Sequence, residues 1–129
     1  MIDKRIISYT RSILKSNPGL REVLGNFEVF YQKAGKEPKY NFITLRAKRS
    51  KHNDPVQEGI LYIDVYCVNN NDHEKLIEAA NVIESLLDEC VFPGGGALRT
   101  YLRDLEFSED IAKQLISANL MFSFRGMNF

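Results

Sequence analysis

The stretch from Gly59 to Cys90 reads GILYIDVYCV, then NNND, then HEKLIEAANVIESLLDEC. β-branched and aromatic residues dominate its first part, as is typical of strands. The last part places apolar side chains at helical spacing, namely Leu76, Ala79, Ala80, Ile83, Leu86, Leu87 and Cys90. Asn71 precedes Glu74 by the spacing of a capping box. The stretch therefore predicts one long strand followed by one capped amphipathic helix, which the rest of the chain must cover.

The flanking sequence predicts shorter elements on both sides of this pair. Apolar spacing indicates a helix from Asp3 to Lys15 and a second, short helical turn from Leu20 to Leu24 that ends at Gly25. Strands are expected over Phe27–Tyr31, Tyr40–Ala47, Ile60–Val68 and Leu115–Gly126, and Leu98–Phe107, where alternation is partial, is either a strand or mixed structure. Loops or turns are expected over Lys48–Glu58, Val91–Gly96 and Ser108–Lys113.

These elements predict a single α+β domain over residues 1–129. Neighbouring strands joined by loops without a helix between them favour antiparallel pairing. We therefore expect a mainly antiparallel sheet of four to five strands with two helices packed on one face. In the long strand, the odd positions from Leu61 to Cys67 are apolar and should face the helices. The even positions Tyr62, Asp64 and Tyr66 should face solvent or a partner.

The charge of the chain is balanced overall but unevenly distributed. Lys and Arg number 17, as do Asp and Glu, so the formal net charge is zero. A protein that works mainly by wrapping nucleic acid is usually strongly basic, so balanced charge argues against that class. The segment 33–51 nevertheless holds seven basic residues against one acidic residue, a net charge of +6. One interpretation is that this segment is a solvated surface without a binding role. The other is that it contacts an acidic partner protein or a nucleic acid backbone.

The two cysteines and the chain's hydropathy indicate a cytosolic environment without a membrane span. Cys67 and Cys90 belong to no CxxC or disulfide-dense pattern, so we expect reduced thiols. The N-terminal sequence lacks the apolar core of a signal peptide. No apolar run approaches the roughly 20 residues that a membrane helix needs.

No set of residues in the sequence predicts an active site, a metal or a cofactor. The triple glycine Gly94–Gly96 is followed by Ala-Leu-Arg instead of the Lys-Ser/Thr of a P-loop. His52 and His73 have no partners at metal-ligand spacing. The acidic residues from Asp104 to Asp110 are interpreted as a solvated turn, although a carboxylate pair is the alternative. We therefore expect a protein that is not an enzyme.

Two groups of side chains are candidates for partner binding. The first is the basic group Lys48, Arg49 and Lys51. The second is the even face of the long strand, Tyr62, Asp64 and Tyr66, where aromatic and charged side chains mix as they do at protein interfaces. Plain solvated surface is the alternative interpretation for both groups.

The order of elements, with several local phrases, resembles the tail-terminator (tail-completion, head–tail joining) family of long-tailed bacteriophages and prophages. The phrases are SNPGLREVLG leading into FEVF, YNFITL from Tyr40 to Leu45, IDVYC from Ile63 to Cys67 with its following helix, and the terminal FSFR from Phe122 to Arg125. The resemblance covers nearly the whole chain. The glycine-rich loop 93–96 and the basic residues 48–51 do not map onto the family pattern.

This resemblance implies a structural protein that forms a homo-oligomeric ring, typically a hexamer, at the head-proximal end of the tail tube. Such a ring stops tail polymerisation and joins the tail to the head, so its partners are the tail tube protein and a head-completion or neck protein. DNA passes through the lumen without specific binding. The implied location is the virion, after assembly in the host cytoplasm. The alternatives are a head-completion or neck adaptor protein, or a small nucleic-acid-binding module that uses the basic segment 33–51.

Overall fold

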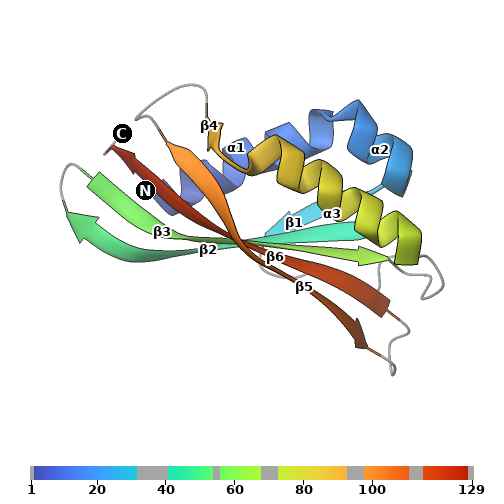
Figure 1. Cartoon of the computed structure of the whole chain (residues 1–129). Coiled ribbons are helices and arrows are strands. Elements are labelled where there is room, and N and C mark those ends of the chain that lie inside the picture. Colours follow the sequence, from blue (N-terminus) through green and yellow to red (C-terminus); the bar gives the residue numbers. More distant parts are fainter. Residues whose placement is uncertain are drawn as a thin grey trace.

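The computed structural model describes residues 2–31, 41–53, 56–67, 73–92, 98–110 and 115–127. Its helices are α1 (Ile2–Ser16), α2 (Pro18–Leu24) and α3 (His73–Leu87). Its strands are β1 (Glu28–Tyr31), β2 (Phe42–Asn53), β3 (Val56–Cys67), β4 (Cys90–Val91), β5 (Arg99–Asp110) and β6 (Leu115–Met127). The three helices lie on one side of the sheet (Figure 1).

Local signals account for the ends of α2. The Asn17 side chain caps the helix by accepting a hydrogen bond from the backbone N–H of Leu20 at 2.8 Å, and Pro18 occupies the first turn. At the other end Gly25 adopts φ 71° and ψ −141°, and its N–H donates to the carbonyl of Arg21. That backbone conformation is almost restricted to glycine, so Gly25 ends the helix as the sequence predicts. The predicted cap at Asn71 lies outside the described residues.

The sheet differs from the sequence-based expectation. It has six strands in the order β1-β2-β3-β6-β5-β4 and curls into a half-barrel, with three helices instead of two. It is mixed, because β1 pairs with β2 in parallel while every other neighbouring pair is antiparallel. The expected mainly antiparallel sheet of four to five strands with two helices is therefore wrong.

Two physical reasons explain this error. The antiparallel rule assumes a tight turn, but residues 32–40 can span roughly 30 Å when extended, enough to carry the chain back to the end of the sheet where β1 begins. The strand β4, Cys90–Val91, is too short for any hydrophobic period to reveal it, yet it pairs with Arg99 and Thr100 of β5.

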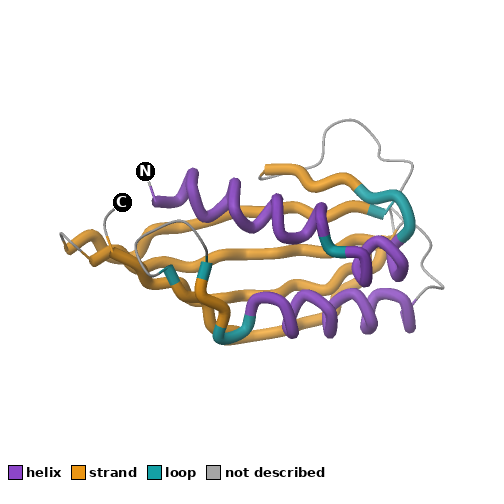
Figure 2. Tube along the Cα trace, turned by 90° about the horizontal axis from the view of Figure 1, so that it is seen from above, coloured by secondary structure: helices purple, strands orange, loops and turns teal. Residues whose placement is uncertain are grey.

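The main core lies between the sheet and the helices; Figure 2 shows the helices lying over the sheet. The predicted alternation in β3 is confirmed, because Leu61, Ile63, Val65 and Cys67 are all fully buried. In β6, Ile116, Ala118, Leu120, Phe122 and Phe124 are buried in the same way. From α3 the buried residues are Leu76, Ala79, Ala80, Ile83 and Leu87. The strand and helix of the opening stretch thus form the centre of the core.

Two predicted connections are strands in the structure. The sequence from Lys48 to Glu58 was expected to be a loop, but β2 continues to Asn53 and β3 begins at Val56, so the two form one long hairpin. β5 likewise continues through Ser108 to Asp110, where a turn was expected. Polar residues hide both extensions from a search for hydrophobic alternation. In the described part of the chain, no helix is long and apolar enough to cross a membrane.

Candidate interaction surface

The face of the sheet turned away from the helices, called here the open face, carries the sequence-predicted strand residues. Side chains alternate across a strand, so residues opposite one another in the register share a face. Its members include Phe42, Thr44, Arg46 and Lys48 of β2; Glu58, Ile60, Tyr62, Asp64 and Tyr66 of β3; Arg99, Tyr101, Asp104, Glu106 and Ser108 of β5; and Ser117, Asn119, Met121, Ser123 and Arg125 of β6. Aromatic, polar and charged side chains are mixed on this surface.

An aromatic row crosses one end of the open face. Phe42 stacks on Tyr66 with ring centroids 4.7 Å apart and planes inclined by 13°. Phe30 of β1 meets Phe42 edge to face at 6.1 Å. Phe42 is buried although it lies outside the main core cluster. The row therefore forms a second, smaller apolar contact that ties β1, β2 and β3 together.

The Tyr66 hydroxyl lies in a partly buried, polar setting. Burial raises the pKa of Tyr66 above its ordinary value of 10.0, and the nearby carboxylate of Asp64 raises it further. A hydrogen bond with the Thr44 side chain and the positive charge of Arg46 act in the opposite direction. At neutral pH this hydroxyl is protonated, so it can donate a hydrogen bond but cannot serve as a base.

A polar network continues from Asp64 across β6 to β5. The Asn119 side-chain amide donates to Asp64 Oδ1 at 2.8 Å. The Ser108 hydroxyl donates to Asn119 Oδ1 at 2.9 Å and lies 2.6 Å from the Ser117 hydroxyl. Because Asp64 accepts from Asn119, it is a structural link between strands as well as a surface group. We therefore interpret this hydrogen-bond network as one that orders the strands of the sheet.

Basic side chains gather at the other end of the open face. The Arg46 guanidinium lies over the Tyr62 ring, 4.2 Å from its centroid. Arg103 donates from Nε to the Ser123 hydroxyl at 2.8 Å and lies 5.7 Å from the Tyr101 ring centroid. The bulge between Leu102 and Asp104 accounts for this position, since it inserts Arg103 as an extra residue in β5.

The structure brings Tyr62, Asp64, Tyr66 and Lys48 onto one face. Lys48 is exposed and is opposite Ile60, one step along the hairpin from the Arg46–Tyr62 pair. Arg49 and Lys51 lie farther along β2, on either side of a register shift. Sequence reasoning counted Arg46 only as part of the basic segment 33–51, and it gave Arg103 no role. The missed signal was the pairing register, which single-strand alternation cannot supply.

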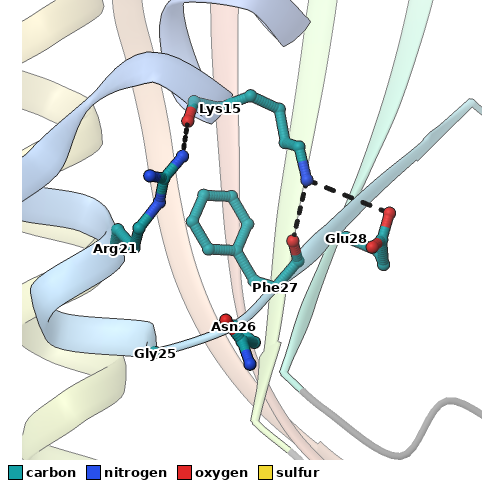
Figure 3. Close-up of a pocket in the computed structure, with 6 residues that line it drawn as sticks. All are labelled: Lys15, Arg21, Gly25, Asn26, Phe27 and Glu28. Atoms are coloured by element: carbon teal, nitrogen blue, oxygen red, sulfur yellow. Dashed lines mark hydrogen bonds and ion pairs between the residues drawn. The ribbon is translucent and has the colours of Figure 1, made fainter.

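A pocket of about 340 Å³ lies where α1, α2 and β1 meet (Figure 3). The Lys15 ammonium donates to the Phe27 carbonyl at 3.1 Å and lies 3.9 Å from Glu28 Oε2. Arg21 donates to the Lys15 carbonyl at 2.7 Å. Lys15 therefore ties α1 to the segment that enters β1, Arg21 ties α2 to the end of α1, and the pocket is explained by these packing and capping contacts.

The described residues offer no cluster of metal ligands. No group of three or more His, Cys, Asp and Glu side chains able to hold a metal gathers within them. Neither cysteine forms a disulfide; Cys67 is fully buried, and burial raises the pKa of Cys90. A buried or high-pKa thiol is a poor nucleophile, so neither residue is poised for catalysis.

Comparison with known proteins reveals likeness in fold. No protein-family model and no curated protein sequence matches the chain. A chain in the structure described as the virion of a native gene transfer agent (GTA) particle is similar, with a TM-score of 0.79 and 12% identity over 95% of this chain and 95% of that chain. A second solved structure has a TM-score of 0.62 and 12% identity, over 96% of this chain and 91% of that chain. The protein therefore shares its fold, over nearly its whole length, with a chain of a gene transfer agent particle.

Proposed function

We propose that this chain is a structural protein of a bacteriophage or prophage particle. In this proposal it forms a ring at the head-proximal end of the tail tube, stops tube polymerisation and joins the tail to the head. The observation that carries the proposal is the likeness in fold, over 95% of both chains, to a chain of a gene transfer agent virion. The resemblance of the local phrases to tail-terminator proteins points to the same role.

The surface chemistry fits such an assembly role. A ring of identical subunits needs two different, complementary surfaces on each copy. The open face supplies aromatic and charged side chains spread over four strands, without a converging set of reactive groups among the described residues. A protein that joins partners needs shape and charge of this kind. The partners in this proposal are further copies of the chain, the tail tube protein and a head-completion or neck protein.

The first experiment is electron microscopy of particles from which this chain has been deleted. If the ring ends tube growth, deletion gives tubes longer than the normal tail and free of heads, and supplying the purified protein restores normal length. Normal tubes that merely lack heads would point to the alternative, a head-completion or neck adaptor protein. Normal, infective particles would overturn both roles.

Charge reversal tests the predicted role of Lys48, Arg49 and Lys51. Replacing all three by Glu lowers the net charge by 6, two units at each position, and we expect fewer joined particles. The matched control K4E/R5E/R11E changes the charge equally on the exposed side of α1 and should leave joining unchanged. Equal joining by both variants would mean that the residues at 48–51 are ordinary solvated surface.

The nucleic-acid-binding alternative is less favoured, because the same open face carries Asp64, Asp104 and Glu106. A phosphate backbone laid across the sheet would meet these carboxylates. Binding of DNA that weakens steeply with added salt would nevertheless support this alternative. We expect the isolated protein to show no such binding at physiological ionic strength.

A further inference from the structure

The two outer parts of the sheet carry opposite charge. The segment Arg46–Asn53 of β2, called the basic edge, lies beyond the four residues of β2 that pair with β1. It contains Arg46, Lys48, Arg49 and Lys51 and no acidic residue. The segment Asp104–Asp110 of β5, called the acidic edge, lies beyond the residues of β5 that pair with β4. It contains Asp104, Glu106, Glu109 and Asp110 and no basic residue.

Neither edge has a strand neighbour on its outer side within the described residues. Their backbone groups therefore form a template to which a further strand can add. On β5 two amides are already capped by side chains: Leu102 N–H donates to Asp88 Oδ1 at 2.8 Å and Leu105 N–H donates to Asp104 Oδ1 at 2.9 Å. Phe107, farther along the same edge, is 51% exposed, which is unusual for a phenylalanine in a strand.

We propose that copies of this chain join head to tail, with the acidic edge of one copy adding to the basic edge of the next. This inference rests on the proposed ring and names the contact that would build it. The strand directions permit the pairing. The chain direction reverses at each of the pairs β2–β3, β3–β6 and β6–β5, so β2 and β5 run antiparallel to each other. A neighbour's β2 placed beside β5, with both open faces on the same side, therefore continues the alternation of the sheet.

The short strands β1 and β4 set the offset between copies. β1 pairs with the outer edge of β2 from Phe42 to Leu45, and β4 pairs with the outer edge of β5 at Arg99 and Thr100. The two free edges lie at opposite ends of the sheet, the β2–β3 hairpin at the left of Figure 1 and the far end of β5 at the lower right. Copies must therefore be staggered along the strand direction, with β1 and β4 as stops on either side of the contact.

The charges favour a heterologous contact, in which the basic edge of one copy meets the acidic edge of the next. With the open faces aligned, Arg46 and Lys48 of one copy lie on the same face as Asp104 and Glu106 of the next, where opposite charges across strands attract. Two basic edges, or two acidic edges, repel each other, which disfavours a twofold dimer. Charged residues on an edge strand also serve to prevent aggregation, but charges of either sign on either edge would do that. The division of signs between the two edges is what indicates pairing between copies.

Charge-swap mixing tests this contact. The variant R46E/K48E carries acidic residues at the open-face positions of both edges, and the variant D104K/E106K carries basic residues at those positions on both edges; Arg49, Lys51, Glu109 and Asp110 are unchanged in both variants. We expect each variant alone to associate at least tenfold more weakly than the wild type, measured by mass photometry over a concentration series at low salt. An equimolar mixture should recover association, because every contact then joins opposite charges, and so should the variant that carries all four changes. The control K4E/R11E on α1 should associate as the wild type does.

A ring made from the mixture alternates the two variants, so it can close only with an even number of copies.

Circular dichroism verifies that each variant is folded. The inference is overturned if the mixture fails to recover association, if the single-edge variants assemble normally, or if the folded wild type stays monomeric at every concentration.

Zero-length carbodiimide coupling of the wild type provides a second measurement. In a mixture of ¹⁵N-labelled and unlabelled protein, we expect cross-linked peptides that join Lys48 or Lys51 of one copy to an acidic-edge residue of another. Such links cannot form within one chain, since β3 and β6 separate β2 from β5 by roughly 14 Å. Cross-links between copies that avoid both edges would overturn the inference. Copies that associate in this way but leave tube length unchanged in the deletion assay would overturn the proposed function alone.

Discussion

Phe42 and Tyr66 stack across β2 and β3 on the open face, with ring centroids 4.7 Å apart. Phe42 is only 4% exposed there, because Tyr66 lies on one side of it and Phe30 on the other. An aromatic pair of this kind contributes about 0.5–1.5 kcal/mol beyond the area that it buries. The open face is therefore stabilised at one end by a row of rings, in addition to the core beneath the helices.

Replacing Phe42 by Ala should accordingly lower the free energy of unfolding by about 3 kcal/mol, since it removes a buried ring and the contacts on both of its sides. Urea unfolding followed by circular dichroism measures this loss. The matched control is Phe107→Ala, because Phe107 is half exposed, and there the change should stay within about 0.5 kcal/mol. Similar losses in the two variants would show that the aromatic row does not stabilise the fold.

The raised pKa of Tyr66 makes a second prediction, about stability at high pH. Well below pH 10 the hydroxyl is protonated in both folded and unfolded chains, so its contribution to stability is fully present. Above that pH the unfolded chain loses the proton more readily, and the contribution is lost as the pH rises through the raised pKa of the folded state. Other Tyr and Lys side chains titrate in the same range, so the comparison must be between the wild type and Tyr66→Phe.

The expected result is that the wild type loses stability more steeply than Tyr66→Phe between about pH 9 and pH 11.5. Urea unfolding midpoints at several pH values give the two slopes. Parallel slopes would mean that Tyr66 ionises equally easily in the folded and unfolded chains, contrary to its partly buried position beside Asp64.

The sequence predicted the elements that bury apolar side chains with a regular period. The alternation of Leu61, Ile63, Val65 and Cys67 in β3 placed that strand and its inward face correctly, and the helical stripe from Leu76 to Leu87 did the same for α3. Burial of one face leaves a periodic trace in a single strand or helix. These signals were enough for the two-layer arrangement of a sheet beneath helices.

The number and pairing of the strands were beyond this reasoning. The parallel pairing of β1 with β2 depends on a connection whose course no local pattern records, and β4 has only two residues. The polar ends of β2 and β5 have no buried face, so no period marks them. For the same reason the sequence predicted a loop at Lys48, Arg49 and Lys51 and a turn from Ser108 onward, where β2 and β5 continue. Only the register shows that these residues form opposite edges of one sheet.

A third prediction concerns Gly59, which lies opposite Phe124 of β6 on the core side of β3. A Cβ atom at this position would collide with the Lys48 carbonyl oxygen and with the Phe124 ring. We expect Gly59→Ala to lower the free energy of unfolding by about 2 kcal/mol, because neither the backbone carbonyl nor the buried ring can move away cheaply.

A double-mutant cycle with Phe124→Leu tests the cause of that loss. The smaller side chain costs stability by itself but removes the ring that the added methyl group of Gly59→Ala would strike. The double variant should therefore be more stable than the sum of the two losses predicts. Urea unfolding of all four proteins gives the coupling. Additive losses would mean that the collision with the Lys48 carbonyl, or backbone conformation alone, accounts for the effect.

The fourth prediction compares one substitution at two buried threonines. Thr10 of α1 and Thr100 of β5 are both fully buried. The Thr10 hydroxyl has no hydrogen-bond partner among the described residues, whereas the Thr100 hydroxyl donates to the Leu87 carbonyl at 2.5 Å and ties β5 to the end of α3. Valine has nearly the shape of threonine, so replacing each residue by Val mainly removes the hydroxyl.

Thr10→Val should therefore raise the free energy of unfolding by about 1 kcal/mol, because it removes a polar group that is buried without compensation. Thr100→Val should lower it by about 1–2 kcal/mol, because it leaves the Leu87 carbonyl buried and without this donor. Helix propensities of Thr and Val are nearly equal, so the change in α1 reports the hydroxyl itself. Thermal and urea unfolding measure both variants. A loss of stability in Thr10→Val comparable to that in Thr100→Val would mean that the Thr10 hydroxyl does find an acceptor in the folded protein.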